Sequence, residues 1–419
     1  MRVLYNTALV IYYLAVHLAA IFNGKAKKWI KGRKEIFTTL TKNSESLQHP
    51  LWIHASSLGE FEMARPLIDM IKEQMPEQKI IVSFYSPSGY EIRNNYENID
   101  LAVYLPFDFT KRIRKFIQKV NPCCAIFIKY DLWLNTINEL HKNNIPTYLV
   151  SANFREDQIY FKWYGKIFMN ILHKLNGIFV QNEKSFQLLQ NHNIHKVYLS
   201  GDLRFDRVYQ TKSKSFLIPV IDKFKNNQLL FIAGSTWEPG DHLIINYILK
   251  EGLKKDIKFI IAPHQIHESK IRHILKQLNG NAIAYSQIDE SKIHQYKAIV
   301  IDNIGMLSSL YAYGNIAYVG GGFGKSLHNV LEATTYGLPV LIGPNHYKFP
   351  EIQELIDKSC VFPIADQESF NSKLNELIAS KDQLKIISEK AKKFVQCRTG
   401  CSQSVFNEIQ QILRLSQTH

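Results

Sequence analysis

The sequence predicts an α/β fold made of two Rossmann-like, doubly wound domains, and three observations predict it. Short apolar runs alternate with helical stretches along nearly the whole chain, a polar, Lys-rich stretch at 207–227 interrupts the alternation, and a glycine run at 320–322 follows one of the later apolar runs. Alternating strands and helices form parallel sheets with helices on both faces. A length of 419 residues also exceeds one ordinary core and suits two domains.

The first 23 residues are predicted to form a membrane anchor or interfacial helix. Residues 3–22 make an apolar run of about bilayer-spanning length, and six basic residues follow at 25–34. Basic residues after the apolar run do not suit a cleavable signal, and they hold the rest of the chain on the cytoplasmic side. The alternative is a buried first helix of the globular domain.

The next segment, 24–206, is predicted to be the first Rossmann-like domain. Its apolar, β-branched and aromatic runs predict strands at 51–56, 79–86, 101–106, 123–129, 146–152, 177–182 and 196–201. Between the first two runs, residues 59–75 carry apolar side chains at helical spacing and predict a helix.

The polar stretch 207–227 is predicted to be a linker to a second Rossmann-like domain at 228–419. The strands predicted there lie at 229–235, 258–264, 282–287, 297–302, 315–321 and 338–344. The last helix, from about 383 to 396 and beyond, can pack on either half, including back on the first domain. Ligands of doubly wound domains bind at the carboxyl ends of the strands, so we expect a cleft there between the two halves.

Composition limits the classes of function. A hydrophobic content of 46% with 21% charged residues is typical of a folded protein, and the net charge of +14 predicts anionic partners such as lipid or a phosphorylated substrate. No nucleic-acid-binding motif appears, and neither do HExxH, Walker A, GxSxG or CxxC patterns. The five cysteines lack the spacing of a disulfide framework or a zinc site and are predicted to be reduced thiols in the cytoplasm.

The glycine run and the segment after it predict a nucleotide-sugar site. A predicted strand leads into the glycines, and His328, Asn329 and Glu332 follow in a stretch, 328–337, that is predicted to be helical. Backbone N–H groups at such a turn favour phosphate, and Glu332 can accept hydrogen bonds from a ribose diol. Without these three side chains the run would be an ordinary phosphate loop or a packing device.

Glu60 is the first candidate catalytic residue. It lies where the strand at 51–56 gives way to the helix at 59–75. A carboxylate at a helix start can serve as a general base toward an attacking hydroxyl. It can equally serve only to cap the helix and complement its dipole.

Other polar residues follow predicted strands and have structural alternatives. Ser235 and Thr236 can donate to phosphate or cap a helix, and His264 can face a ligand or be a hydrogen-bonded structural residue. The turn around Gly305 can present main-chain groups to a base edge. Asp131 can cap a helix or steer charge at the site, and Arg204 can neutralise a leaving phosphate or lie on the surface.

Taken in order, these segments resemble the Kdo (3-deoxy-D-manno-octulosonic acid) transferases of lipopolysaccharide synthesis, which are GT-B glycosyltransferases. The resemblance covers nearly the whole chain, through WIHASSLGE, SPSGY, YLPFD, KYDLWLN, VSANFR, VQNE, GDLRFD, AGSTWEPGD, APH and GGGFGKSLHNVLEATTYGLPVLIGP. It implies two Rossmann-like domains facing a central cleft, the first binding the acceptor and the second the CMP-sugar. It also implies transfer of Kdo from CMP-Kdo to a lipid A precursor (lipid IVA) with release of CMP.

The same resemblance implies an inverting, metal-independent enzyme without a cofactor, held at the inner membrane with its catalytic domains on the cytoplasmic side. Glu60 would take the family's proton-acceptor role, and Asp131 and Arg204 would stabilise the transition state. The predicted donor-binding residues are Ser235, Thr236, Pro263, His264, Ile304, Gly305, Met306, His328, Asn329, Val330, Leu331 and Glu332. The chain departs from common family residues at Lys129, Arg204, Pro263 and Met306.

Two alternatives remain open at this point. One is another GT-B enzyme, a transferase or epimerase, that uses a UDP-sugar, from which base selectivity would distinguish it. The other is a non-catalytic, membrane-tethered module that binds lipid or nucleotide, in which binding would survive the loss of Glu60.

Overall fold

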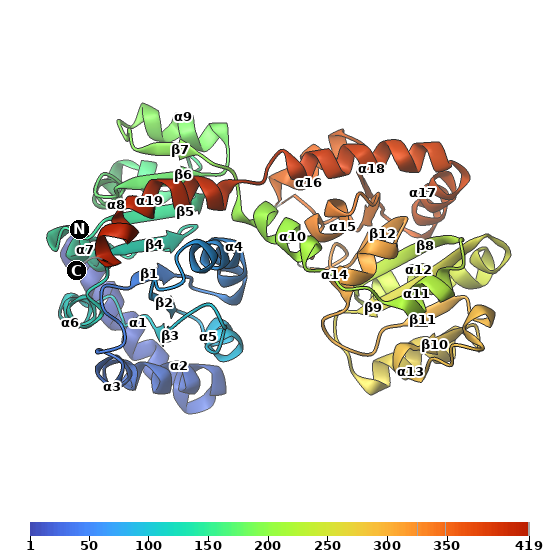
Figure 1. Ribbon diagram of the computed structural model, residues 1–419, viewed down its shortest axis with the longest axis horizontal. Coiled ribbons are helices and arrows are strands. Elements are labelled where there is room, and N and C mark those ends of the chain that lie inside the picture. The colour runs from blue at the N-terminus through green and yellow to red at the C-terminus, as the bar shows by residue number, and fades with distance from the viewer. Residues whose placement is uncertain (325, 348, 418–419) are drawn as a thin grey trace. The chain divides into compact units, whose positions relative to one another are not determined.

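The structure is a computed structural model that describes residues 1–324, 326–347 and 349–417. It divides into two compact units (Figure 1). Unit 1 comprises Met1–Arg207 and Arg398–His419, and unit 2 comprises Val208–Cys397. Lys325, Lys348 and the last two residues lie outside the described residues.

Unit 1 is built on a parallel sheet of seven strands in the order β3-β2-β1-β4-β5-β6-β7. The strands are β1 Leu51–His54, β2 Ile80–Phe84, β3 Leu101–Tyr104, β4 Cys124–Ile128, β5 Thr147–Ala152, β6 Gly177–Val180 and β7 Val197–Leu199. Each overlaps a predicted strand, so the doubly wound fold is confirmed here. The chain leaves β1 toward β2 and β3, then returns to β4 on the other side, which makes the β1/β4 pair the switch point of the sheet.

Helices cover both faces of this sheet. They are α1 Arg2–Phe22, α2 Gly24–Lys34, α3 Ile36–Lys42, α4 Leu58–Gln74, α5 Pro87–Arg93, α6 Thr110–Val120, α7 Leu134–Lys142, α8 Lys166–Leu172, α9 Glu183–Asn191 and α19 Cys401–Gln417. Alternate residues of β1 belong to opposite cores, because side chains point alternately to the two faces of a strand. Trp52 packs with Ile81 and Phe116 on one face, and Leu51 packs with Phe61 on the other.

Unit 2 repeats the architecture with the strand order β10-β11-β9-β8-β12-β13-β14. Its strands are β8 Leu229–Thr236, β9 Ile257–Pro263, β10 Ala282–Ala284, β11 Ala298–Val300, β12 Ile316–Val319, β13 Val340–Ile342 and β14 Val361–Pro363. The last strand was not predicted; Val361 is its buried residue, and Pro363 ends it. In this unit the switch point lies between β8 and β12.

The helices of unit 2 are α11 Pro219–Lys225, α12 Glu238–Lys250, α13 Glu268–Gln277, α14 Leu307–Leu310, α15 Leu331–Thr335, α16 Pro350–Asp357, α17 Gln367–Ala379 and α18 Lys381–Gln396. The segment 207–227, expected to be a linker, contains most of α10 Leu203–Ser213 and all of α11. Ile221 and Phe224 of α11 are fully buried. These two apolar side chains, three positions apart in a Lys-rich stretch, hold the helix on unit 2.

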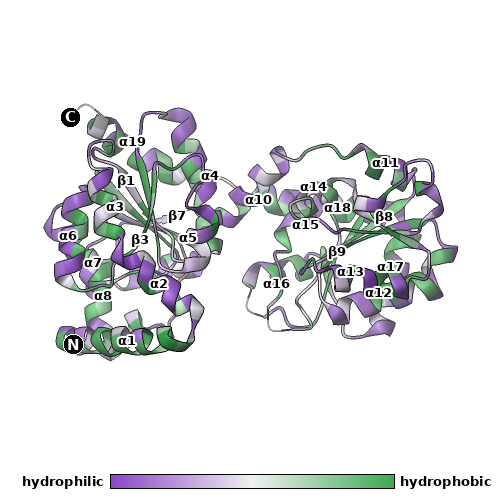
Figure 2. Cartoon of the chain, turned by 90° about the horizontal axis from the view of Figure 1, so that it is seen from below, coloured by the Kyte–Doolittle hydropathy of each residue, from purple (hydrophilic) through white to green (hydrophobic). Residues whose placement is uncertain are grey.

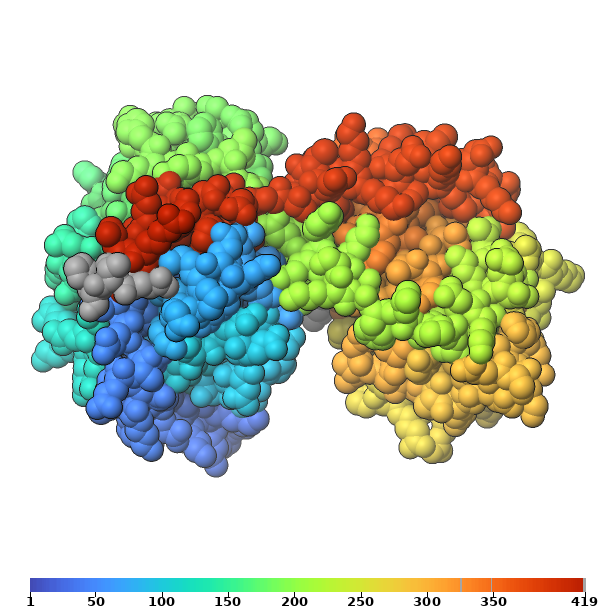
Figure 3. Space-filling model, viewed as in Figure 1, coloured from blue at the N-terminus to red at the C-terminus, as the bar shows by residue number. Residues whose placement is uncertain are grey.

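The C-terminal helix α19 lies in unit 1 although the sequence places it after the second domain. Its apolar face, with Val405, Phe406, Ile409 and Leu413, joins the core that contains Leu51 and Phe61. In Figure 3 this red segment lies against the blue segments of unit 1. Asp206 receives the backbone N–H groups of Gly400 (2.6 Å) and Ser402 (2.6 Å) at the start of this helix.

The first helix, α1, lies along one side of unit 1 (Figure 2). By length and composition it could cross a membrane. One face is fixed to the unit by hydrogen bonds of Tyr5 to Asp108 (2.7 Å) and of Asn135 to Asn6 (2.8 Å). Leu9 is the buried residue of α1, and most of its other apolar side chains face outward. The helix is therefore an amphipathic helix on the surface of unit 1 and not a buried first helix of the domain.

Candidate active site

The switch point of unit 1 carries a cluster of polar residues centred on His54. This imidazole is fully buried at the end of β1. Its Nδ1 lies 2.8 Å from the hydroxyl oxygen of Ser83 on β2, and its Nε2 lies 3.1 Å from Oδ2 of Asp131, in the loop after β4. A carboxylate oxygen accepts, so Nε2–H donates to Asp131. The ring thus fixes the position of the carboxylate.

Glu60 lies at the third position of α4, which begins next to this cluster. The Ser57 N–H donates to its carboxylate (3.2 Å), and the Glu60 N–H donates to the Ser57 hydroxyl (3.4 Å), which together form a capping box. Glu60 therefore caps α4, as the structural alternative for this residue predicts. This capping does not exclude a catalytic role, because one carboxylate offers about four acceptor positions.

Burial raises the pKa of the Glu60 carboxyl, and the negative charge of Asp131 raises it further. The nearby His54 and Lys129 act in the opposite direction with smaller effects. A carboxylate with a raised pKa is a stronger base toward a hydroxyl proton. The surroundings of Glu60 thus suit proton acceptance and not merely capping.

The loop after β4 also holds Lys129 in the left-handed region, with φ of 65°. Next to it, burial raises the pKa of Tyr130, and the charges of Arg155, Asp202 and Arg204 also act on this hydroxyl. Arg204 itself is ion-paired with Asp202 at 2.6 Å. The structure therefore brings Asp131 and Arg204 to the same edge of the sheet in unit 1, with the Arg204 charge partly balanced.

The switch point of unit 2 carries a stack of three rings. Trp237 follows β8, His264 follows β9 and His328 follows β12, so all three lie at the carboxyl edge of the sheet. Ring centroids of Trp237 and His264 are 4.7 Å apart, and those of His264 and His328 are 4.3 Å apart. Trp237 Nε1–H donates to His328 Nε2 (2.9 Å). Burial lowers the pKa of His328, and His264 lowers it further, which favours the neutral ring that accepts from Trp237.

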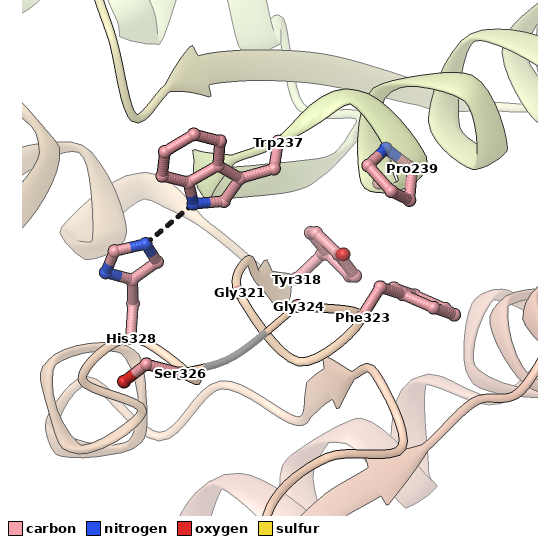
Figure 4. A pocket seen from close by; sticks show the side chains of 9 residues that line it. Trp237, Pro239, Tyr318, Gly321, Phe323, Gly324, Ser326 and His328 are labelled. Atoms are coloured by element: carbon pink, nitrogen blue, oxygen red, sulfur yellow. Dashed lines mark hydrogen bonds between the residues drawn. The ribbon is translucent and has the colours of Figure 1, made fainter.

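A cavity of about 440 Å³ opens beside this stack (Figure 4). Trp237, Tyr318 and Phe323 provide ring surfaces, and Gly321 and Gly324 provide backbone. Gly321 has φ of 94°, and a side chain on Gly320 would meet the carbonyl oxygen of Ser235 at 2.0 Å. The glycine run is thus needed for the close approach of the β8 and β12 ends.

The segment after the glycine run is less helical than predicted. The helix α15 covers Leu331–Thr335, because Asn329 Oδ1 accepts from the Leu331 N–H (3.2 Å) and Gly337 (φ 86°) ends it. Asn329 Nδ2 donates to the Glu332 carboxylate (3.2 Å). Glu332 is therefore oriented at the carboxyl edge of the sheet, while Val330 and Leu331 are buried packing residues.

The remaining predicted donor residues have different environments. Ser235 is half-buried with φ of 50°, whereas Thr236 is buried and donates to Asp241, so its hydroxyl is occupied. Pro263 ends β9.

The turn 304–306 follows β11. Ile304 is 90% exposed, Gly305 has φ of 100° and Met306 is buried. The exposed Ile304 and the adjacent backbone remain the groups of this turn that a ligand can reach.

Sequence reasoning did not assign roles to His54, Ser83 and Trp237. A histidine at the end of an otherwise apolar strand was the available signal for the first. Ser83 and Trp237 carried none. Within residues 1–324, 326–347 and 349–417 there is no group of three or more His, Cys, Asp and Glu side chains that could hold a metal ion.

Comparisons with known proteins agree with this architecture. UDP-GlcNAc 2-epimerase from Neisseria meningitidis superposes with a TM-score of 0.60 at 13% identity, over 86% of this chain and 100% of that one. Two parallel doubly wound units, each with polar residues at its switch point, define a protein of the GT-B class.

Sequence comparison finds similarity to one family of transferases. The model of the 3-deoxy-D-manno-octulosonic-acid transferase (kdotransferase) family matches residues 31–207. A transferase of that name from Rickettsia bellii is 27% identical over 96% of this chain and 96% of its own length, and one from Aquifex aeolicus is 27% identical over 83% and 91%. The chain is thus similar to the Kdo transferases over nearly its whole length.

Proposed function

We propose that this protein transfers Kdo from CMP-Kdo to a lipid A precursor and releases CMP, as a membrane-associated glycosyltransferase of lipopolysaccharide synthesis. The observation that carries the proposal is the cluster of Glu60, His54 and Asp131 at the switch point of unit 1 in a chain similar to this family. The catalytic units act on the cytoplasmic side of the inner membrane, and the reaction uses neither a metal ion nor a cofactor.

In this reaction Glu60 accepts the proton of the acceptor hydroxyl as its oxygen attacks the anomeric carbon of Kdo. A sugar hydroxyl is a poor nucleophile at neutral pH, so a base within hydrogen-bonding reach lowers the barrier. Attack opposite the departing phosphate of CMP inverts the configuration of that carbon. Asp131, held by His54, keeps the Glu60 pKa raised, and Arg204 offsets the negative charge that develops on the leaving group.

Unit 2 binds the donor in this proposal. Glu332, oriented by Asn329, accepts from the ribose hydroxyls, and the turn 304–306 presents backbone to the cytosine edge. We expect the CMP part of the donor, which contains a single phosphate, to bind beside the stacked His264 and His328 at the β8/β12 switch point. In this proposal the switch point of unit 2 binds the nucleotide, although the sequence has no Walker A (P-loop) pattern.

The membrane supplies the acceptor. The outward face of α1 exposes Val3, Leu4, Ile11, Leu14, Leu18, Ile21 and Phe22. Most basic residues of α2 follow directly and face solvent. This combination favours binding in the interface of an anionic bilayer.

One assay tests the proposal. CMP release from CMP-Kdo is measured with and without a tetra-acylated disaccharide bisphosphate, with UDP-sugars as the donor control. We expect release only with CMP-Kdo and acceptor together, and loss of it in Glu60→Gln. Turnover of a UDP-sugar instead would favour a different GT-B enzyme, a transferase or an epimerase. Ligand binding without turnover would favour a non-catalytic module.

A further inference from the structure

A short segment of unit 1, Ile159–Lys166, presents an unusual exposed aromatic surface. Two successive turns of 3₁₀ helix, η1 Ile159–Phe161 and η2 Trp163–Gly165, form it between β5 and α8. The Trp163 side chain is 93% exposed, and Tyr164 and Ile159 beside it are 46% and 41% exposed. A tryptophan so open to water loses the free energy that its burial would provide, and this suggests a function outside the folded chain.

The backbone of this segment is tightly built, so Trp163 is not exposed because the loop is loose. The Gly165 N–H donates to the Lys162 carbonyl (2.7 Å), and Phe161 packs edge-on against Phe154 with centroids 5.9 Å apart. A side chain on Gly165 would meet the Ile159 carbonyl oxygen at 1.5 Å. The chain therefore holds Trp163 outward in a fixed place.

The segment connects to the N-terminal part of α1 through a row of aromatic contacts. Tyr160 packs edge-on against Phe168 of α8 (6.4 Å), and Phe168 packs edge-on against Tyr5 of α1 (6.1 Å). In Figure 2 α8 lies next to α1 in unit 1. The exposed aromatic segment is thus joined, through α8, to the N-terminal part of α1.

The flanking charges agree with a lipid partner. Lys162 and Lys166 stand on either side of the Trp163–Tyr164 pair, and long lysine stems can lie along apolar surface with the ammonium at the head groups. Arg155 is balanced by Asp157, with a nitrogen–oxygen separation of 3.5 Å. Tryptophan and tyrosine are the residues that favour the membrane–water interface.

We propose that Ile159–Lys166 is a second membrane-contacting element, which inserts Trp163 and Tyr164 into the interface of an anionic bilayer beside α1. This inference rests on the proposed function only for the presence of a membrane-borne acceptor. Two separate contacts fix the orientation of unit 1 on the bilayer, which α1 alone, as a single rod, does not. Burial and, to a smaller degree, the negative charge of Asp131 raise the pKa of Tyr160 in the same segment to about 12.

The test compares Trp163→Asp with Leu217→Asp in the full-length protein. Leu217 is 84% exposed and belongs to unit 2, so it is a matched exposed apolar residue that is not part of the proposed surface. Binding is measured by co-sedimentation with vesicles of phosphatidylglycerol and phosphatidylethanolamine. We expect roughly a ten- to hundredfold weaker partition coefficient for Trp163→Asp, the size of one buried large side chain, and no change for Leu217→Asp.

A second measurement locates the indole directly. Lipids brominated near the head group should quench the fluorescence of the wild type more than that of Trp163→Phe, which retains the other four tryptophans. Equal quenching and equal partition in wild type and variants would overturn the proposal. Unchanged vesicle binding with a raised KM for acceptor in detergent would instead assign Trp163 to the acyl chains of the substrate.

The proposed function fails separately from this inference. Trp163→Asp should retain wild-type CMP release with acceptor dispersed in detergent, where no bilayer needs to be engaged. A wild type that releases no CMP under any condition would remove the transferase proposal, while the vesicle measurements would still decide whether the segment binds membrane.

Discussion

His54 Nε2 lies 3.1 Å from the Oδ2 atom of Asp131, although 77 residues separate them in the chain. The other ring nitrogen is held by Ser83, so the imidazole is a fixed bridge between β2 and the loop after β4. This makes His54 a positioning residue for a carboxylate that acts on Glu60.

His54→Gln should lower kcat by roughly ten- to a hundredfold, because a hydrogen bond to a charged group is worth about 1.5–3 kcal/mol. KM for CMP-Kdo should change little, since the proposed donor-binding residues lie on unit 2. The control is Ser83→Ala, which removes one support of the ring and should give a smaller loss. A kcat unchanged in a variant that melts normally would assign His54 to packing alone.

Glu60→Gln should lower turnover by about 10²–10⁴-fold, the usual contribution of a positioned general base. Glutamine retains an acceptor oxygen for the Ser57 N–H, so CMP affinity and melting temperature should change little. Ser57→Ala is the matched control, because it breaks the capping box at a cost of about 0.5–2 kcal/mol in stability and leaves the base in place. If the two variants show the same activity, Glu60 is only a cap.

Asp131→Asn should move the acidic limb of the kcat/KM profile to lower pH. The negative charge of Asp131 raises the Glu60 pKa, and this effect exceeds the opposite one of His54, so its removal lets Glu60 ionise at lower pH. The base is active when ionised, so the limb follows its pKa. The measured quantity is the pH at the midpoint of the limb. The maximal kcat/KM is not used, because loss of Asp131 lowers it independently of the Glu60 pKa. A shift to higher pH would contradict the assignment of Glu60 as the titrating base.

Glu332→Ala should weaken CMP binding by roughly ten- to a hundredfold, because hydrogen bonds to a charged acceptor contribute about 1.5–3 kcal/mol. Titration calorimetry with CMP measures it directly. Asn329→Ala removes the side chain that orients Glu332 and should cause a smaller loss. Full affinity in a folded Glu332→Ala protein would exclude this residue from the ribose site.

The free energy of unfolding should depend on pH through the buried Asp108, to which Tyr5 of α1 donates a hydrogen bond. Burial raises its pKa from 3.8 to about 6 although Thr136, Tyr5 and Asn135 donate to it. A group with a raised pKa in the folded state contributes stability that is complete below its unfolded pKa and lost as pH rises through the folded one. The free energy of unfolding of the wild type should therefore contain a decrease between about pH 4 and 6 that Asp108→Asn lacks. Asp157→Asn, at an exposed carboxylate, is the control and should retain the decrease.

The sequence by itself determined the local elements and the order of the chemistry-bearing segments. Apolar runs such as 51–56 and 229–235 became β1 and β8, because a continuous run of β-branched and aromatic residues is stable only when buried on both faces of a parallel sheet. Parallel connectivity then required polar residues that follow the strands, including Glu60, Asp131 and His264, to lie at the carboxyl edges.

Only the tertiary structure decided which distant residues meet. Nothing local in LWIHA shows that His54 will lie between Ser83 and Asp131, because strand order, not sequence distance, brings β1, β2 and β4 together. The same reason placed α19 on unit 1, where its apolar face completes a core begun by β1 and α4. It also turned the polar side of α1 toward Asp108 and Asn135 and left its apolar side and Trp163 outward. Periodicity shows that a helix has an apolar face, but what covers that face depends on contacts between residues that are far apart in the chain.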